Sequence, residues 1–145
     1  TEEFWTKAIS SLNIPAGIEE LNNQWIDGYK LIDGTRDLIL ELKKAGLPQY
    51  YLSDNVRERV DRLNQKTGFL EWFDGGLFSF EVDVRKPNPR FYELGIERTK
   101  VLPTETFFVD DKLSALEPAK KMGIYTILFI SPEECRVELR NLGLL

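Results

Sequence analysis

The segment Thr106-Phe107-Phe108-Val109-Asp110-Asp111-Lys112 decides how the rest of the chain is interpreted. An apolar run of high strand propensity leads directly into two adjacent carboxylates, and a helical pattern follows. Two carboxylates at the end of a buried strand repel each other, so we expect a compensating cation, and oxygen-only ligands suit Mg²⁺. In the alternative interpretation, Asp111 caps the next helix and Asp110 faces solvent.

Helix and strand patterns alternate around this segment from about residue 34 onward. The expected strands cover residues 50–52, 77–80, 106–109 and 124–130. The expected helices are one that ends at Gly46, one near 55–67, one that Pro89 opens, one near 113–122, and a last one that carries Val137, Leu139 and Leu142. Such alternation requires right-handed crossovers and predicts an α/β fold: a Rossmann-like three-layer sandwich with a mostly parallel sheet between helices.

The first 28 residues differ from this pattern. They contain two short amphipathic helical stretches separated by Pro15-Ala16-Gly17, and a linker at 27–30 comes next. We therefore divide the chain into a small helical part, residues 1–28, and a sheet-containing core, residues 29–145.

Polar residues follow two other predicted strands, where ligand sites of parallel sheets lie. Ser53-Asp54-Asn55 ends the first strand, and Arg85-Lys86-Pro87-Asn88-Pro89 follows the second. Ser53 precedes a helix N-terminus, which attracts anions, and Lys86 presents a point charge suited to phosphate oxygens. Each motif has a simpler explanation, a helix cap for the first and a solvated lysine for the second. Because the strand ends converge on one edge, we expect one combined anion and metal site.

Composition removes several classes of function. The 145 residues include 19 Lys and Arg against 24 Asp and Glu, which gives a net charge of −5 and disfavours nucleic-acid binding. There is no histidine, so mechanisms built on imidazole are excluded, and the single Cys135 allows neither an internal disulfide nor a thiolate cluster. No apolar run is long enough for a membrane span, and no secretory pattern is present; we expect a cytoplasmic protein.

Three sequence segments carry a resemblance to a known family: Tyr51-Leu52-Ser53-Asp54-Asn55, Arg85 to Tyr92 and Phe107 to Lys112. In order and spacing they resemble the second, third and fourth motifs of the haloacid dehalogenase (HAD) superfamily. A further segment, Leu116 to Ile124, resembles the segment after the fourth motif in that superfamily. The likeness covers nearly the whole chain, with residues 1–28 similar to the last helices of a helical cap. Asp54 and Ala115 stand where the family commonly has asparagine.

The resemblance implies a magnesium-dependent phosphatase acting on a small phosphorylated substrate. By this likeness, Ser53 and Lys86 are catalytic, Ser53, Asp54, Asn55 and Lys86 bind the phosphate, and Asp110 and Asp111 bind Mg²⁺. Phosphoryl transfer depends mainly on positioning and charge neutralisation, which these residue types supply. The acid pair favours a phosphatase over a dehalogenase, since the dehalogenases of the superfamily lack it.

The first family motif, Asp-x-Asp-x-Thr, is absent from the sequence. In the family it supplies the aspartyl nucleophile and the central strand, between the strands that end in Ser53 and Asp110. Without it we expect two unpaired strand edges, which favour self-association, and an inactive chain. Because the sequence begins at Thr1 and its one methionine is Met122, we expect it to be a truncated form of an active parent.

Two other classes of protein fit parts of the pattern. One is a non-catalytic HAD-like binding protein; if the chain is of this class, we expect the upstream sequence also to lack the paired aspartates. A two-component receiver domain also combines an acid pair, a hydroxyl and a Lys-Pro at strand ends, but its acid pair comes first in the sequence. Here the order is Ser53, Lys86, Asp110, which argues against a receiver.

Overall fold

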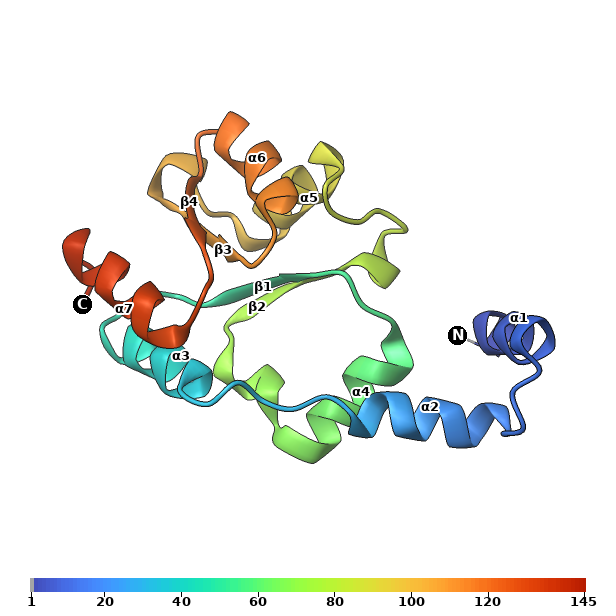
Figure 1. Ribbon diagram of the computed structural model, residues 1–145. Helices are drawn as coiled ribbons and strands as arrows, with labels where there is room; N and C mark the ends of the chain where they lie inside the picture. The colour runs from blue at the N-terminus through green and yellow to red at the C-terminus, as the bar shows by residue number, and fades with distance from the viewer. Residues whose placement is uncertain (1) are drawn as a thin grey trace.

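Seven α-helices and four strands make up residues 2–145, which the computed structural model describes (Figure 1). Thr1, the first residue of the expected helical part, lies outside the described residues. The helices are α1 (Glu2–Leu12), α2 (Ile18–Asp27), α3 (Thr35–Lys44), α4 (Arg57–Thr67), α5 (Pro89–Thr99), α6 (Leu113–Lys121) and α7 (Pro132–Asn141). None of these helices combines the length and hydropathy needed to cross a membrane.

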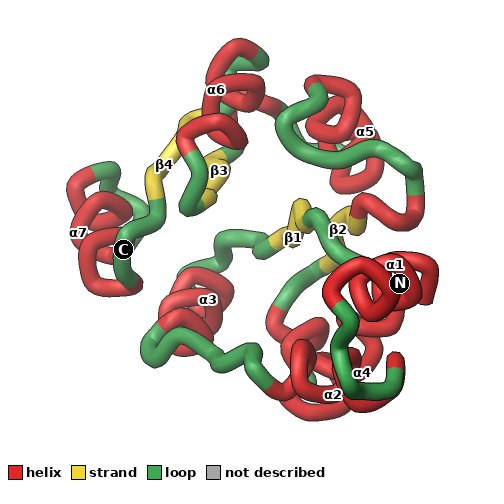
Figure 2. Tube along the Cα trace, turned by 45° about the vertical axis from the view of Figure 1, so that its right-hand side comes forward, coloured by secondary structure: helices red, strands yellow, loops and turns green. Residues whose placement is uncertain are grey.

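The strands form two separate parallel pairs. β1 (Tyr50–Ser53) pairs with β2 (Gly75–Phe78), and β3 (Phe107–Asp110) pairs with β4 (Tyr125–Leu128). Within residues 2–145 no strand joins β1 to β3, and the two pairs stand apart in Figure 2. Each pair therefore keeps an edge whose backbone N–H and C=O groups have no strand partner.

Helices cover both faces of the strand layer. Phe107 and Phe108 are neighbours on β3 and point to opposite faces, as alternation along a strand requires. Phe107 packs in a core with α3, β4 and α7, which includes Leu38 and Leu139. Phe108 packs in a second core with β2, α5 and α6. This arrangement confirms the expected α/β three-layer architecture.

Residues 2–27 form α1 and α2, which lie to one side of the strands, with α2 alongside α4 (Figure 1). The guanidinium carbon of Arg59 on α4 lies 3.6 Å from the centroid of the Trp25 ring on α2, and Trp25 meets Trp5 of α1 edge to face. A cation held against an aromatic face contributes about 0.5–2 kcal/mol. These contacts attach the two helices to α4; the assignment of residues 1–28 to a cap stays a prediction.

The expected strand at 77–80 was wrong in its bounds. β2 begins two residues earlier, at Gly75, and residues Ser79–Glu81 form a short 3₁₀ helix. Gly76 has a φ of +151°, and a Cβ there would lie 2.2 Å from the carbonyl oxygen of Tyr51. Only glycine fits this close approach of β2 to β1, and its low strand propensity hid the strand start.

Candidate functional site

A pocket of about 220 Å³ opens at the carboxyl ends of β1 and β3. It brings together five of the six expected site residues: Ser53, Asp54, Lys86, Asp110 and Asp111. The full lining is Ser53, Asp54, Lys86, Pro87, Asp110, Asp111, Lys112, Ser114 and Ala115. The carboxyl ends of β1 and β3 thus meet at one pocket, as the sequence pattern predicts.

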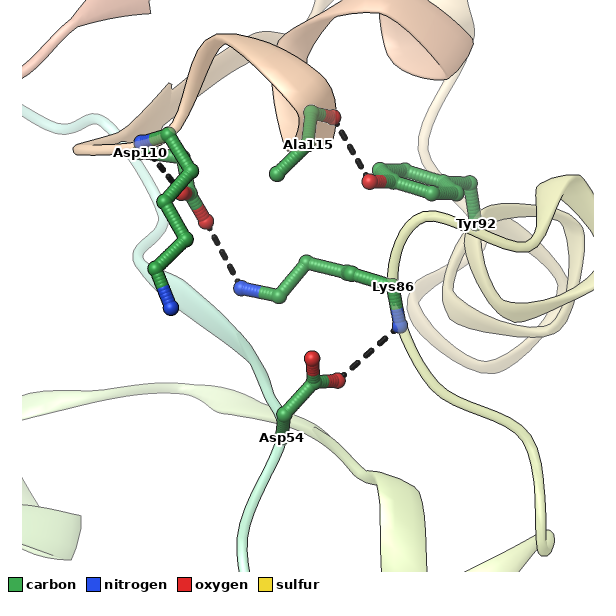
Figure 3. Close-up of polar contacts among 6 residues, drawn as sticks. Asp54, Lys86, Tyr92, Asp110 and Ala115 are labelled. Atoms are coloured by element: carbon green, nitrogen blue, oxygen red, sulfur yellow. Dashed lines mark hydrogen bonds and ion pairs between the residues drawn. The ribbon is translucent and has the colours of Figure 1, made fainter.

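An ion pair occupies the middle of this pocket. Lys86 Nζ donates to Asp110 Oδ2 at 2.7 Å (Figure 3), and the side chains of Lys86 and Asp110 are only 16% and 8% exposed. The ammonium also lies 5.6 Å from the centroid of the Phe108 ring. Removing either partner of such a shielded pair costs stability, because the remaining charge is left desolvated and without a counter-ion.

The backbone of the lysine loop is fixed from both sides. The backbone N–H of Lys86 donates to Asp54 Oδ1 at 3.0 Å, which ties the loop to the end of β1 (Figure 3). Two residues after Lys86, the Asn88 side chain caps α5 by accepting from the N–H of Arg90, with Pro89 in the first turn. Asp54, expected among the phosphate-binding residues, thus lines the pocket and also holds the lysine loop in place.

Asn55 lies beside the pocket without lining it. Its backbone N–H donates to Ser79 Oγ at 3.1 Å, and the same hydroxyl donates back to the Asn55 carbonyl at 3.2 Å. Its side-chain oxygen accepts from the N–H of Val56. These bonds fix the turn after β1, and the phosphate contact expected for Asn55 stays a prediction.

The acid pair offers two carboxylates for a metal. Asp110 Oδ1 accepts the backbone N–H of Lys112 at 2.9 Å while Oδ2 holds Lys86, so its orientation is set. No group of three or more His, Cys, Asp or Glu side chains within residues 2–145 is arranged to hold a metal ion. Mg²⁺ prefers oxygen ligands such as carboxylates, and its shell contains about six oxygen atoms in total, several of them from water. Asp110 and Asp111 therefore fit part of a magnesium shell, and the remaining ligands have to come from water, substrate or another segment.

Sequence reasoning missed Tyr92, which does not line the pocket but contacts Ala115, a residue of its lining. Its side chain is 1% exposed, and its hydroxyl donates to the Ala115 carbonyl in the first turn of α6 at 2.6 Å (Figure 3). Burial, together with the negative charges of Asp110 and Asp54, raises the pKa of Tyr92. The sequence did hold a signal for this contact. Tyr92 lies on the apolar face of α5, which predicts burial, and a buried tyrosine hydroxyl needs a hydrogen-bond partner.

Parallel strands between two helical layers, with a lysine and an acid pair in a pocket at the strand ends, define the class of the fold: an α/β protein with a charged pocket at its strand ends. The sequence matches the haloacid dehalogenase-like hydrolases over residues 6–123. The chain therefore belongs to this family, as its motifs predict.

Known proteins resemble the chain over different extents. Mouse (Mus musculus) bifunctional epoxide hydrolase 2 is 31% identical over 93 residues, which are 61% of this chain and 17% of that protein. Glyceraldehyde 3-phosphate phosphatase of Methanocaldococcus jannaschii is 26% identical over 79% of this chain and 50% of its own length. A HAD family enzyme of Bacteroides thetaiotaomicron, crystallised as a magnesium complex, superposes with a TM-score of 0.80 at 23% identity over 95% of this chain and 73% of that one. The chain thus spans less than a fifth of the first relative and half of the second.

Proposed function

We propose that this chain is part of a magnesium-dependent phosphatase that hydrolyses a small phosphorylated metabolite through an aspartyl-phosphate. The observation that carries the proposal is the shielded Lys86–Asp110 ion pair in a pocket lined by Ser53 and Asp111. The pocket offers a hydroxyl and an ammonium for phosphoryl oxygens and, directly beside them, carboxylates for a divalent ion. Phosphoryl transfer needs these elements and little covalent chemistry beyond a nucleophile.

Each side chain has a defined task in this proposal. The Ser53 hydroxyl donates to a phosphoryl oxygen, and Lys86 neutralises charge between the phosphoryl group and Asp110. Asp110 and Asp111 would hold Mg²⁺, which when bound draws negative charge away from the phosphoryl oxygens. Asp54 keeps the Lys86 backbone at the pocket through the 3.0 Å hydrogen bond. Preorganised charges of this kind lower the barrier because they need no rearrangement during the reaction.

The nucleophile in this proposal lies on a strand that fills the gap between β1 and β3. Both strands end at the pocket and lack a partner strand there within residues 2–145. A parallel strand between them would satisfy both edges and present its last side chains to Asp110 and Ser53. An aspartate at its end supplies both the nucleophile and a third metal ligand, which the described residues lack.

The substrate class in this proposal is a small phosphorylated compound. Three relatives act on compounds of this class by name: glyceraldehyde 3-phosphate phosphatase, D-ribitol-5-phosphate phosphatase and phosphorylated carbohydrates phosphatase. The Bacteroides thetaiotaomicron enzyme was also crystallised with magnesium and inorganic phosphate.

Binding of inorganic phosphate tests the proposal on the chain as it stands. In an amide NMR titration with Mg²⁺ present, we expect shifts at Ser53, Lys86 and Asp111, and loss of binding in Lys86→Met and Asp111→Asn. The matched controls are Lys120→Met and Glu117→Gln, exposed changes on α6 outside the pocket lining. We expect no hydrolysis of p-nitrophenyl phosphate by this chain alone. Phosphate-induced shifts confined to another surface would refute the site.

A non-catalytic HAD-like binding protein is the second candidate. The observation that favours it is the lack of a third metal-binding carboxylate within residues 2–145. The two candidates differ in the strand that fills the gap between β1 and β3. An Asp-x-Asp sequence on that strand supports the phosphatase, and its absence supports the binding protein.

A further inference from the structure

Lys112 and Ser114 line the pocket but have no task in the proposed phosphoryl transfer. The other polar side chains of the lining are committed: Lys86 to Asp110, Asp54 to the lysine loop, and Ser53 with the acid pair to phosphate and metal. Within residues 2–145, neither the Lys112 ammonium nor the Ser114 hydroxyl has a hydrogen bond or ion pair. They are therefore available to a ligand.

The fold does not need the Lys112 side chain. Lys112 stands at the N-cap of α6 but makes no side-chain capping bond, and only its backbone N–H is used, by Asp110 Oδ1. Both Lys112 and Ser114 are exposed on the wall formed by the start of α6. An unpaired ammonium on a concave wall attracts an anionic group, and a hydroxyl two residues away adds a hydrogen-bond donor.

We propose that Lys112 and Ser114 bind a carboxylate of the substrate, so that the substrates are phosphorylated hydroxy acids. This inference rests on the proposed function, because it assigns the part of the substrate beyond the phosphoryl group. One ammonium and one hydroxyl match the single charge and two oxygens of a carboxylate. A second phosphate fits less well, because Asp54, Asp110 and Asp111 line the same small pocket and repel a second dianion.

Two probes that differ in one group test the proposal. In the presence of Mg²⁺, the full 145-residue chain is titrated with 3-phosphoglycerate and with glycerol 3-phosphate, in which a CH₂OH replaces the carboxylate, and amide NMR shifts give both dissociation constants. A pair at the rim of a pocket contributes about 0.2–1 kcal/mol, so we expect 3-phosphoglycerate to bind about 1.5- to 5-fold more tightly. In Lys112→Met most of the preference is lost, and in Lys112→Met/Ser114→Ala the two probes bind equally, while Lys112→Arg and the control Lys120→Met keep the preference. Ser114→Ala reduces it in part.

Equal binding of the two probes by the unaltered chain overturns the carboxylate subsite and leaves the phosphatase proposal standing. A preference that survives in full in Lys112→Met/Ser114→Ala also overturns it, because the carboxylate is then bound elsewhere. If neither probe nor inorganic phosphate shifts the pocket amides, and Lys86→Met changes nothing, the proposed function fails and the subsite fails with it.

Discussion

Lys86 and Asp110 come from different parts of the chain and form an ion pair. Within residues 2–145 no strand connects the β1–β2 pair to the β3–β4 pair, and this ion pair lies between them. Lys86 belongs to the loop before α5, and Asp110 is the last residue of β3. Their ion pair, together with the bond from Lys86 N–H to Asp54, crosses from one strand pair to the other. An ion pair in this position has a structural role, whose contribution to stability mutations can measure.

Lys86→Met is expected to destabilise the chain by about 3 kcal/mol, because it leaves the Asp110 carboxylate shielded and without a cation. Urea unfolding measures this change. In the double variant Lys86→Met/Asp110→Asn the uncompensated charge is gone, so much of the loss should be recovered. A single variant as stable as the original chain would show that the pair contributes little.

Tyr92→Phe keeps the buried ring and removes only the hydroxyl that donates to Ala115. The carbonyl at the start of α6 loses this donor, and we expect a loss of about 1–2 kcal/mol in unfolding free energy. Thr106→Val is a matched control, since it removes a side-chain bond to the Leu102 carbonyl far from the pocket. Only Tyr92→Phe should shift the amide signals of Asp111 and Lys112; equal spectra at these residues would contradict a link between Tyr92 and the acid pair.

At the scale of elements, β1 and β2 are joined at their start through Asp74. The Gln49 N–H donates to Asp74 Oδ2 at 2.9 Å, the Asp74 N–H donates to the Gln49 carbonyl at 2.7 Å, and Lys43 of α3 pairs with Asp74 at 3.0 Å. The Gln49 N–H and the Lys43 ammonium lower the pKa of Asp74 below its ordinary value of 3.8.

This lowered pKa gives a pH dependence. A carboxylate with a lower pKa in the folded state stabilises the fold above its unfolded pKa and loses this effect as the pH falls through its folded pKa. Asp74→Ala should therefore lower the melting temperature at pH 7, and the difference should shrink below about pH 3.8. Melting curves from pH 7 to pH 2.5 measure it. A difference that stays constant over this range would mean that the charge of Asp74 is not involved.

Gly76→Ala tests the pairing of β1 with β2. The added Cβ would meet the backbone oxygen of Tyr51, which cannot move without breaking the strand pair, and the φ of +151° is unfavourable for alanine. We expect a loss of several kcal/mol or failure to fold, against a small effect for Gly17→Ala, where a Cβ meets nothing within 4 Å. Similar stability of both variants would argue against the close approach.

The sequence predicted most elements because apolar spacing and punctuating residues mark them. Pro89 opens α5 and the apolar Phe107-Phe108-Val109 run marks β3, as expected. The start of β2 was not predictable from propensity, since Gly75 and Gly76 occupy it for a reason set by contact with β1.

At the scale of the whole molecule, the two strand pairs share helical layers but not a continuous sheet. Leu52 of β1 and Phe108 of β3 both pack against the core that contains Phe91 of α5. Packing against shared helices therefore holds the pairs at one pocket. The unpaired edges of β1 and β3 remain open to any extended segment.

Those open edges give a prediction about association. We expect the chain to self-associate in a concentration-dependent way, because strand exchange between copies satisfies the unpaired backbone groups. Sedimentation velocity over a hundredfold range of protein concentration measures this. A single monomeric species throughout would show that the edges are protected in solution.

The site was predictable only in part, and the reason is topological. Ser53, Lys86, Asp110 and Asp111 follow strands, and parallel strand ends must converge, so their meeting in one pocket follows from the order of elements. Asn55 follows the same strand as Ser53, but its direction depends on the bond to Ser79, which no local pattern encodes. Pairing of Lys86 with Asp110, which leaves Lys112 free, likewise depends on side-chain geometry.

Our central claim is that phosphate and a divalent ion bind next to each other among Ser53, Lys86, Asp110 and Asp111. The most direct measurement is the ³¹P relaxation rate of inorganic phosphate with Mn²⁺ in place of Mg²⁺, with and without the protein. We predict that the protein strongly increases relaxation beyond Mn²⁺ alone, and that Asp111→Asn or Lys86→Met removes the increase while Lys120→Met does not. The same relaxation with and without protein would contradict a shared phosphate and metal site.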